Sequence, residues 1–188
     1  MWKFNTTTDT WTSIGNPNIP NYGLVTVAFT QGQKGYNVIY NYNLQGYYIY
    51  EFDPNTDIWT QKNKSEITGI VWRENVFSYR NKVYLFDSHD NLWYYDEILA
   101  TFQLKSHIDI GYGTFIVTLN DRVYMIKQTG NVYDIFTYDL ENDFTEKFCT
   151  LHNNFPNANT TLVVLNSKFI FLTSRQTCLY ELDISKLQ

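Results

Sequence analysis

The chain is poor in the residues that break, cross-link or punctuate a fold. Its 188 residues include only 9 glycines, 4 prolines, 2 cysteines and 3 histidines. The two cysteines, Cys149 and Cys178, cannot supply the disulfide framework of a small secreted domain, so we expect both as small buried side chains in strands. A reducing, cytoplasmic setting is therefore expected.

An excess of positive charge and long apolar runs are missing as well. The 14 basic and 19 acidic residues give a net charge of -5 and are spread without runs, which argues against nucleic acid or an anionic membrane as the main partner. No apolar stretch approaches the roughly 20 residues that a membrane helix needs. Residues 1–5 lead into no apolar run, so we expect no signal peptide there.

Aromatic residues, in contrast, are abundant and recur at a long period. The 16 Tyr, 13 Phe and 5 Trp residues favour β-strands, whose pleated surface suits aromatic side chains. Residues 50–60 have a near copy in residues 3–12, because Trp59 follows Asp53 at the same spacing at which Trp11 follows Asn5. With a period of roughly 40 to 50 residues, the Trp position recurs as Phe102 and Phe144, and the polar position as Asp96, Asp139 and Asp183.

A second anchor keeps the same phase. A short turn opens an aromatic and aliphatic run at residues 80–86, 120–126 and 166–172, with a weaker copy at residues 35–40. One period contains four strand-like runs, at residues 70–79, 82–86, 91–95 and 101–104, and only residues 96–100 have any helical character. Four short antiparallel strands in each period predict an all-β fold, a β-propeller, in which neighbouring four-stranded blades cover each other's apolar faces.

Residues 50–59, with the pattern aromatic-x-Phe-Asp-Pro-x-Thr-Asp-x-Trp, resemble the kelch repeat. The wider group includes the central propeller domain of galactose oxidase. The Gly-Gly pair that kelch repeats carry after the second strand is absent; its places hold Tyr42-Asn43, Asp87-Ser88, Lys127-Gln128 and Thr173-Ser174. A hemopexin-like four-bladed propeller is the alternative fold, suggested by residues 83–86 followed by residues 93–96.

The repeat divides the chain into about four kelch-like blades within a single domain. We expect a partial blade at residues 1–15, complete blades at 23–62, 67–105 and 109–149, and a partial blade at 160–188. In one interpretation, the strand around Trp11 completes the last blade and closes a four-bladed ring. In the favoured interpretation, the chain is part of a six- or seven-bladed propeller, because ring closure would leave the third strand of the last blade duplicated.

Residues that recur in every blade are expected to serve the blade. Asp53, Asp96, Asp139 and Asp183 are expected to form Asx turns after third strands, and Trp11 and Trp59 to pack between blades. The three histidines lie in different repeats, in predicted loops, without the close spacing of metal ligands. No catalytic motif and no copper-ligand set of the galactose oxidase kind can be matched, so we expect no catalytic residue, no metal and no cofactor.

Function is therefore expected in the loops. The kelch resemblance implies that loops after second strands and the linkers between blades share one face. That face would hold Tyr22, Tyr42, His89, His107, His152, Phe155 and Arg175, and all of these except His107 are expected to bind a partner. It also implies a non-catalytic scaffold that binds a protein partner. The alternative is a carbohydrate-active or oxidoreductase enzyme on a galactose oxidase-like propeller.

Overall fold

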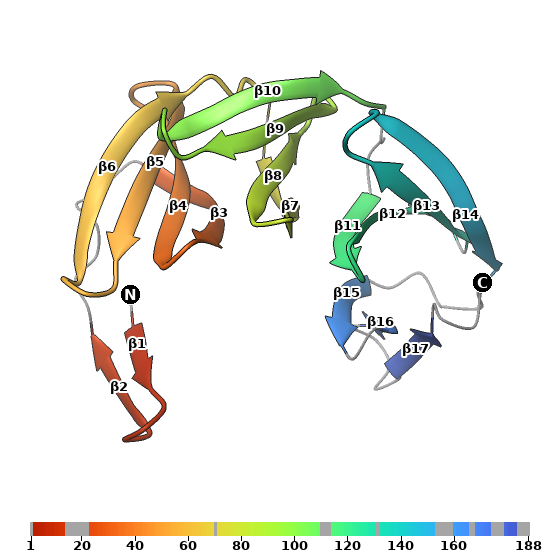
Figure 1. Ribbon diagram of the computed structural model, residues 1–188, viewed down its shortest axis with the longest axis horizontal. Helices are drawn as coiled ribbons and strands as arrows, with labels where there is room; N and C mark the ends of the chain where they lie inside the picture. Colours follow the sequence, from red (N-terminus) through yellow and green to blue (C-terminus); the bar gives the residue numbers. More distant parts are fainter. Residues whose placement is uncertain are drawn as a thin grey trace. The chain divides into compact units, whose positions relative to one another are not determined.

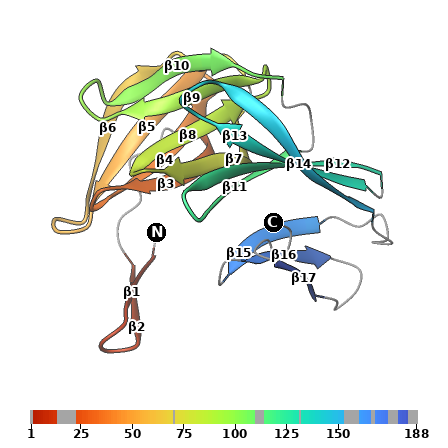
Figure 2. The same cartoon turned by 45° about the vertical axis from the view of Figure 1, so that its right-hand side comes forward.

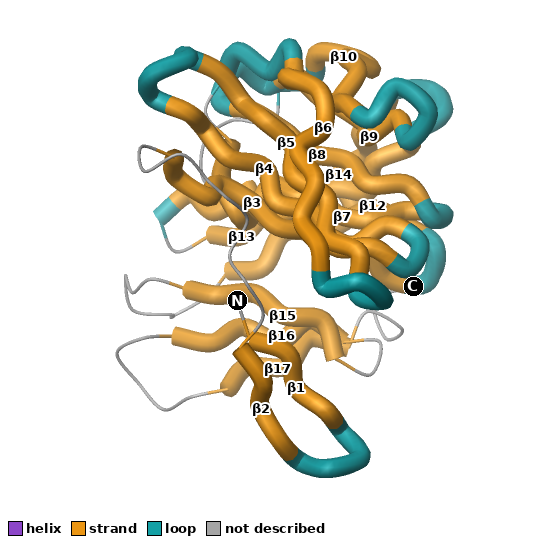
Figure 3. Tube along the Cα trace, turned by 90° about the vertical axis from the view of Figure 1, so that its left-hand side faces the viewer, coloured by secondary structure: helices purple, strands orange, loops and turns teal. Residues whose placement is uncertain are grey.

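The computed structural model consists of strands and turns. It describes residues 2–13, 23–69, 71–109, 114–130, 132–152, 160–165, 168–173 and 179–183. These residues form seventeen strands (Figure 1), and none of them is helical (Figure 3). Accordingly, none of the described segments is a helix long and apolar enough to cross a membrane. The predicted all-β fold class is confirmed.

Strands that follow one another in sequence pair with one another, so each sheet is a meander. The first sheet is a hairpin of β1 (Trp2–Asn5) and β2 (Thr10–Ser13). Three four-stranded sheets follow. The second sheet contains β3 (Gly23–Gln31), β4 (Lys34–Asn41), β5 (Gly46–Asp53) and β6 (Ile58–Ser65). The third contains β7 (Val71–Tyr79), β8 (Lys82–Asp87), β9 (Asn91–Asp96) and β10 (Thr101–His107), and the fourth contains β11 (Thr114–Leu119), β12 (Arg122–Thr129), β13 (Val132–Asp139) and β14 (Phe144–His152). The last sheet contains β15 (Thr160–Leu165), β16 (Lys168–Thr173) and β17 (Leu179–Asp183).

The chain divides into two compact units, which are described separately. The first unit comprises residues 1–76 and 81–107, and the second comprises residues 77–80 and 108–188. The two units are not placed relative to one another.

The Asp that ends β5, β9 and β13 caps the turn that follows each of these strands. Asp96 Oδ1 accepts hydrogen bonds from the backbone N–H groups of Ile98 and Leu99, both at 2.9 Å. The carboxylates of Asp53 and Asp139 do the same for their own turns. Four residues after the cap the backbone is left-handed in all four described turns, at Asp9, Asp57, Ala100 and Asp143. The predicted Asx turns are thus confirmed for these copies, whereas the turn after Asp183 lies outside the described residues.

Aromatic pairs lie across the third and fourth strands. Phe52 stands opposite Trp59 with ring centroids 5.1 Å apart, and Tyr95 stands opposite Phe102 at 5.4 Å. The predicted equivalence of Phe144 with Trp59 is wrong. Phe144 pairs with Asp139, as Ile58 pairs with Asp53. The side chains of Phe144 and Ile58 are each 59% exposed.

The error has a simple cause in the two-residue period of a strand. The segment from Asp139 to Phe144 is one residue shorter than the segment from Asp53 to Trp59. A shift of one residue turns a side chain to the other face of the sheet. Thr145, opposite Tyr138, therefore takes the position that an aromatic residue holds in the other copies.

In the first unit, the sheet β3–β6 lies beside the sheet β7–β10 (Figure 2). Aromatic side chains of both sheets belong to the buried cluster between them. Phe29 stacks on Tyr36, with centroids 4.9 Å apart, and meets Tyr95 and Phe102 edge-on at 5.3 and 5.7 Å. Phe102 is fully buried by this contact. The cross-strand pair of one blade is thus covered by the first two strands of the blade before it.

The two tryptophans of the repeat are less buried than predicted. Trp59 is only partly buried beside Phe52, and Trp11 is 64% exposed, with Phe4 as its aromatic neighbour at 4.8 Å. The hairpin β1–β2 is fixed to the β5–β6 turn by Lys3, whose Nζ reaches Asp57 Oδ1 at 3.0 Å and the Pro54 carbonyl at 3.2 Å. The ring of Phe102 therefore packs between blades, whereas the aromatic neighbours of Trp59 and Trp11 lie in their own sheets.

Glu51 joins three strands of the sheet β3–β6. Its carboxylate, 12% exposed, receives Lys34 Nζ at 2.7 Å, Lys62 Nζ at 3.2 Å and the Tyr36 hydroxyl at 3.1 Å. Burial raises the pKa of the Glu51 carboxyl, but the hydrogen bonds from Lys34, Lys62 and Tyr36 outweigh burial and hold that pKa below its ordinary value. The folded chain therefore stabilises the ionised form.

Replacing Ala100 by glycine should stabilise the fold. Ala100 has a φ of 49°, a left-handed conformation that costs an L-residue about 1 kcal/mol and costs glycine nothing. The free energy of unfolding from urea titration should rise by about that amount. Ala28→Gly, in the exposed part of β3, is the matched control and should lower stability by about 0.5–1 kcal/mol. Equal losses in both variants would contradict the left-handed turn.

Acid should destabilise the protein partly through Glu51. Because the folded pKa lies below the unfolded one, the contribution of Glu51 is fully present above the unfolded pKa and is lost as pH falls through the folded pKa. Between pH 6 and pH 3, stability should fall more steeply in the wild type than in Glu51→Gln, as measured by thermal melts. Glu146→Gln, an exposed position on β14, serves as the control and should follow the wild type.

Candidate functional site

The β4–β5 loop presents two apolar side chains on a fixed backbone. Asn41 is buried, and its Oδ1 accepts hydrogen bonds from the N–H groups of Asn43 and Leu44, both at 3.0 Å. Gln45 closes the loop in a left-handed conformation, with a φ of 45°. Tyr42 and Leu44 are each 58% exposed at the tip. The cap fixes the backbone that carries both.

A row of tyrosines connects this loop to the linker between the two sheets. The Tyr42 ring meets the Tyr40 ring edge-on at 5.2 Å, and Tyr40 meets Tyr47 in the same way at 5.0 Å. The hydroxyl of the buried Tyr47 accepts a hydrogen bond from Val71 N–H at 3.2 Å. Burial raises the pKa of Tyr47, so its hydroxyl stays protonated over the physiological range.

The β8–β9 loop is organised by a buried carboxylate. Asp87 is 1% exposed. Its Oδ1 accepts the N–H groups of His89 at 2.9 Å and Asn91 at 3.2 Å, and its Oδ2 accepts Asn91 Nδ2 at 3.1 Å and Trp93 Nε1 at 2.9 Å. Both oxygens are satisfied by uncharged donors, which makes burial of the carboxylate tolerable. Asp87 thus holds the loop where a kelch repeat would have glycine.

Gly69 brings the β6–β7 linker against this carboxylate. A Cβ atom at position 69 would stand 2.6 Å from Asp87 Cγ, a distance that only glycine avoids. On the other side, Asn91 Oδ1 lies 3.3 Å from Nδ1 of the exposed His107. We call residues 41–47, 66–69, 71, 87–91 and 107 the loop surface; all of them belong to the first unit.

The sequence-predicted binding residues are distributed unevenly. The structure places Tyr42 and His89 on exposed loops of the loop surface. His107 and His152, expected in loops, are instead the last residues of β10 and β14, because the outer strands run further than their patterns indicate. Tyr22, Phe155 and Arg175 lie outside the described residues.

The chemistry of the remaining candidates is limited. Within the described ranges, no group of three or more His, Cys, Asp and Glu side chains is placed to hold a metal ion. Cys149 on β14 is half-buried, and burial raises the pKa of its thiol. Cys178 lies outside the described part of the chain.

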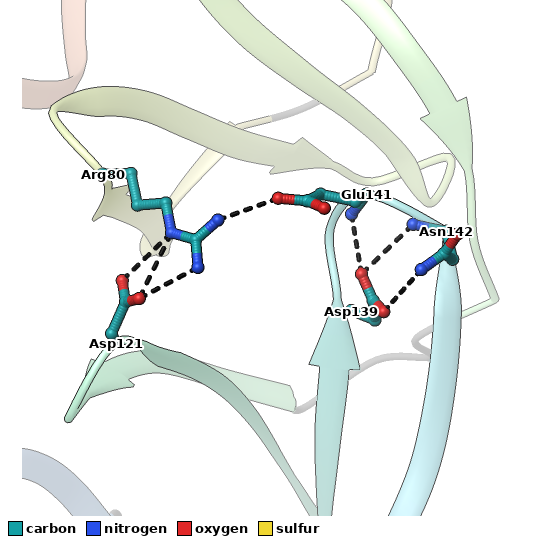
Figure 4. Close-up of polar contacts among 5 residues, drawn as sticks. All are labelled: Arg80, Asp121, Asp139, Glu141 and Asn142. Carbon is teal, nitrogen blue, oxygen red and sulfur yellow. Dashed lines mark hydrogen bonds and ion pairs between the residues drawn. The ribbon is translucent and has the colours of Figure 1, made fainter.

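A second polar cluster lies in the second unit, around Arg80 (Figure 4). Arg80 Nη2 donates to Asp121 Oδ2 at 3.0 Å, and Arg80 Nη1 donates to Glu141 Oε1 at 2.8 Å. Asp139, in the same view, binds the N–H groups of Glu141 and Asn142. The hydrogen bond from Arg80 lowers the pKa of Asp121 and raises that of the guanidinium. The Arg80 guanidinium therefore connects two turns through Asp121 and Glu141. Because these two carboxylates balance its charge, it is poorly suited to bind an anionic ligand.

The β7–β8 turn that carries Arg80 has an uncommon composition. Arg80 and Asn81 have φ values of 47° and 59°, and both central positions of a type I′ hairpin turn require positive φ. Asn and Gly are the residues that tolerate this conformation best, and arginine is not among them. The ion pairs with Asp121 and Glu141 give a reason for arginine here.

Sequence reasoning missed Asp87, Gly69, Asn91 and Leu44. One signal was present, since Asp87-Ser88 replaces the Gly-Gly pair of a kelch repeat. A polar residue in place of glycine indicates that the loop is fastened by a side chain. The hydrogen-bond partners of that side chain come from its own loop and the next strand, and the β6–β7 linker approaches it at Gly69.

Solved structures with this fold are β-propellers. BamB from Moraxella catarrhalis matches with a TM-score of 0.50 and 14% identity over 85% of this chain and 45% of that chain. The nidogen/laminin complex matches with a TM-score of 0.61 and 12% identity over 96% and 66%. An exo-β-1,3-galactanase from Phanerochaete chrysosporium, solved with galactose, matches with a TM-score of 0.51 and 11% identity over 79% and 43%.

These matches establish the fold alone, because sequence identity is so low. No protein-family model and no curated protein sequence matches the chain. The chain spans less than two thirds of the length of BamB and of the matched chain of the nidogen/laminin complex. The β-propeller fold is thereby confirmed, and membership of the kelch family remains a prediction.

Gly69→Ala should loosen the loop surface and destabilise the chain. The new methyl group would press on the Asp87 carboxylate, and overpacking of this kind costs about 1–3 kcal/mol. Gly35→Ala is the matched control, since a Cβ there would meet Phe52 at 3.7 Å, an ordinary contact. Urea titration of both variants tests the close approach. Equal stabilities of the two variants would show that the linker does not contact Asp87.

Proposed function

We propose that the chain is a non-catalytic β-propeller of the kelch type that binds a protein partner through the loop surface. The observation that supports this most directly is the β4–β5 loop. It exposes Tyr42 and Leu44, each at 58%, on a backbone already fixed by Asn41. Tyrosine is enriched among the residues that dominate protein interfaces. A loop ordered before binding loses little conformational entropy when it binds.

The polar groups around the loop suit a protein interface. His89 and His107 are exposed at its edge. Asp87 accepts a hydrogen bond from the backbone N–H of His89, and Asn91 contacts the ring of His107. An apolar centre with polar groups at its margin is the usual composition of an interface. Nidogen, a neighbour with the same fold, was solved in complex with the protein laminin.

The repeated carboxylates support a structural role. Asp53, Asp96 and Asp139 each use a side-chain oxygen to cap their own turn. A carboxylate used in this way at the same place in three successive blades serves the blade. The galactanase neighbour shows that the fold also supports sugar chemistry, so the enzyme alternative is included in the test. The low cysteine content supports a cytoplasmic setting for the interaction.

The double variant Tyr42→Ser with Leu44→Ser should lose the partner and keep its fold. Wild type and variants would be immobilised and exposed to soluble extract of the source cells, and the proteins retained would be quantified by mass spectrometry. We expect at least one protein to be depleted about 10-fold or more, as removal of a central interface contact implies. Melting temperatures should stay close to that of the wild type, since both side chains are exposed.

Leu104→Ser on β10 is the matched control, because Leu104 is also an exposed leucine, at 56%. It should retain the same proteins as the wild type. Unchanged retention by the double variant would contradict the proposed site. Turnover of a sugar that is lost in a stably folded Asp53→Asn variant would replace the scaffold by an enzyme.

A further inference from the structure

One turn of the repeat departs from the others in chemistry while keeping their geometry. The four described turns between third and fourth strands each have an Asp or Asn cap and a left-handed residue four positions later. Between cap and left-handed residue, the second and third positions are Thr7 and Thr8, Asn55 and Thr56, Ile98 and Leu99, and Glu141 and Asn142. Among these four described turns, only the β9–β10 turn has apolar residues at both positions.

The turn does not need these apolar residues. Asp96 supplies the cap, and the three polar copies show that the backbone forms without Ile or Leu. The left-handed position holds Asp in the other copies and Ala100 here, which is the less favourable choice. The backbone of the turn therefore does not require the apolar pair, and we look for its role in a contact outside the blade.

Ile98 and Leu99 are presented to solvent on a fixed loop. Ile98 is 93% exposed and Leu99 is 50% exposed. The carbonyl of Leu99 accepts a hydrogen bond from Asn63 Nδ2 at 2.7 Å, and Thr101 Oγ1 donates to the Lys64 carbonyl at 3.2 Å. Asn63 and Lys64 both lie on β6, within the first unit. The apolar tip is therefore held in position before any contact is made.

We propose that the β9–β10 turn is a second contact point, at which Ile98 and Leu99 enter an apolar pocket with a cationic rim on a protein partner. The charge of the rim follows from Asp96 and the exposed Glu97, which immediately precede the apolar pair. The same carboxylates oppose insertion into an anionic membrane. This contact does not depend on the loop surface, so either can fail without the other.

Selection of peptides from a random phage-displayed library tests the proposal without a known partner. The purified chain would be the bait, and the variant Ile98→Thr with Leu99→Thr would be used for counter-selection. That variant installs the Thr-Thr tip of the β1–β2 turn, so the turn geometry is already found in this chain. Circular dichroism and melting temperature would verify that the variant is folded.

Selected peptides should combine large apolar residues with Lys or Arg. They should bind the double-Thr variant about 10- to 100-fold more weakly than the wild type, which corresponds to the loss of buried aliphatic side chains. Glu97→Lys should weaken them several-fold, and Tyr42→Ser should leave them unaffected. Ala100→Gly, which retains the apolar tip, is the matched control and should bind as the wild type does.

Three results would overturn the proposal. The first is that no selected peptide distinguishes the wild type from the double-Thr variant. The second is that the discriminating peptides are acidic or uncharged. The third is tip-dependent binding to phosphatidylserine vesicles in a co-sedimentation assay, which would assign the turn to lipid.

Discussion

The contact between Phe29 and Tyr36 on one sheet and Tyr95 and Phe102 on the next is the constraint on which the first unit depends. A four-stranded sheet of this kind has two apolar faces and cannot bury both alone. The aromatic contact lets each sheet cover one apolar face of the other, and Phe102 is fully buried in it. The position of the β6–β7 linker in this unit depends on the two sheets being held together.

The linker shows how packing creates the loop surface. Val71 begins β7 within hydrogen-bonding distance of the Tyr47 hydroxyl, and Gly69 lies against Asp87. These contacts join a loop of one sheet to a loop of the other. The linker therefore connects the Tyr47 side of the loop surface with the Asp87 side through Val71 and Gly69.

The repeated features of the fold could be predicted from sequence. The spacing from Asp53 to Trp59 gave the hairpin and its Asx cap, because both depend on a few consecutive residues. The same reasoning failed at Phe144, where one missing residue moved the side chain to the opposite face. It also overestimated the burial of Trp11, since a sequence pattern specifies that a pair forms across strands and not whether another sheet covers it.

The candidate site was less predictable for a physical reason. Tyr42 and His89 could be assigned to loops because turn-forming residues surround them. Asp87 hydrogen-bonds within its own hairpin, to His89, Asn91 and Trp93. The approach of Gly69 to Asp87 and of His107 to Asn91 joins groups further apart in sequence, and no local pattern encodes such contacts. Ile98 was assigned weak helical character, because its neighbours Glu97 and Leu99 favour helices, whereas the Asp96 cap and the left-handed Ala100 make a hairpin turn.

The capped turn also bears on how such a chain evolves. When a blade is duplicated, the Asp cap and the left-handed residue are copied with it, and together they specify the backbone of the hairpin. The residues between them are then not needed for the cap or the left-handed position. Each copy of the turn thus has a position that accepts different side chains, and Thr7, Asn55, Ile98 and Glu141 occupy it in the four described turns, Glu141 with an added ion pair to Arg80.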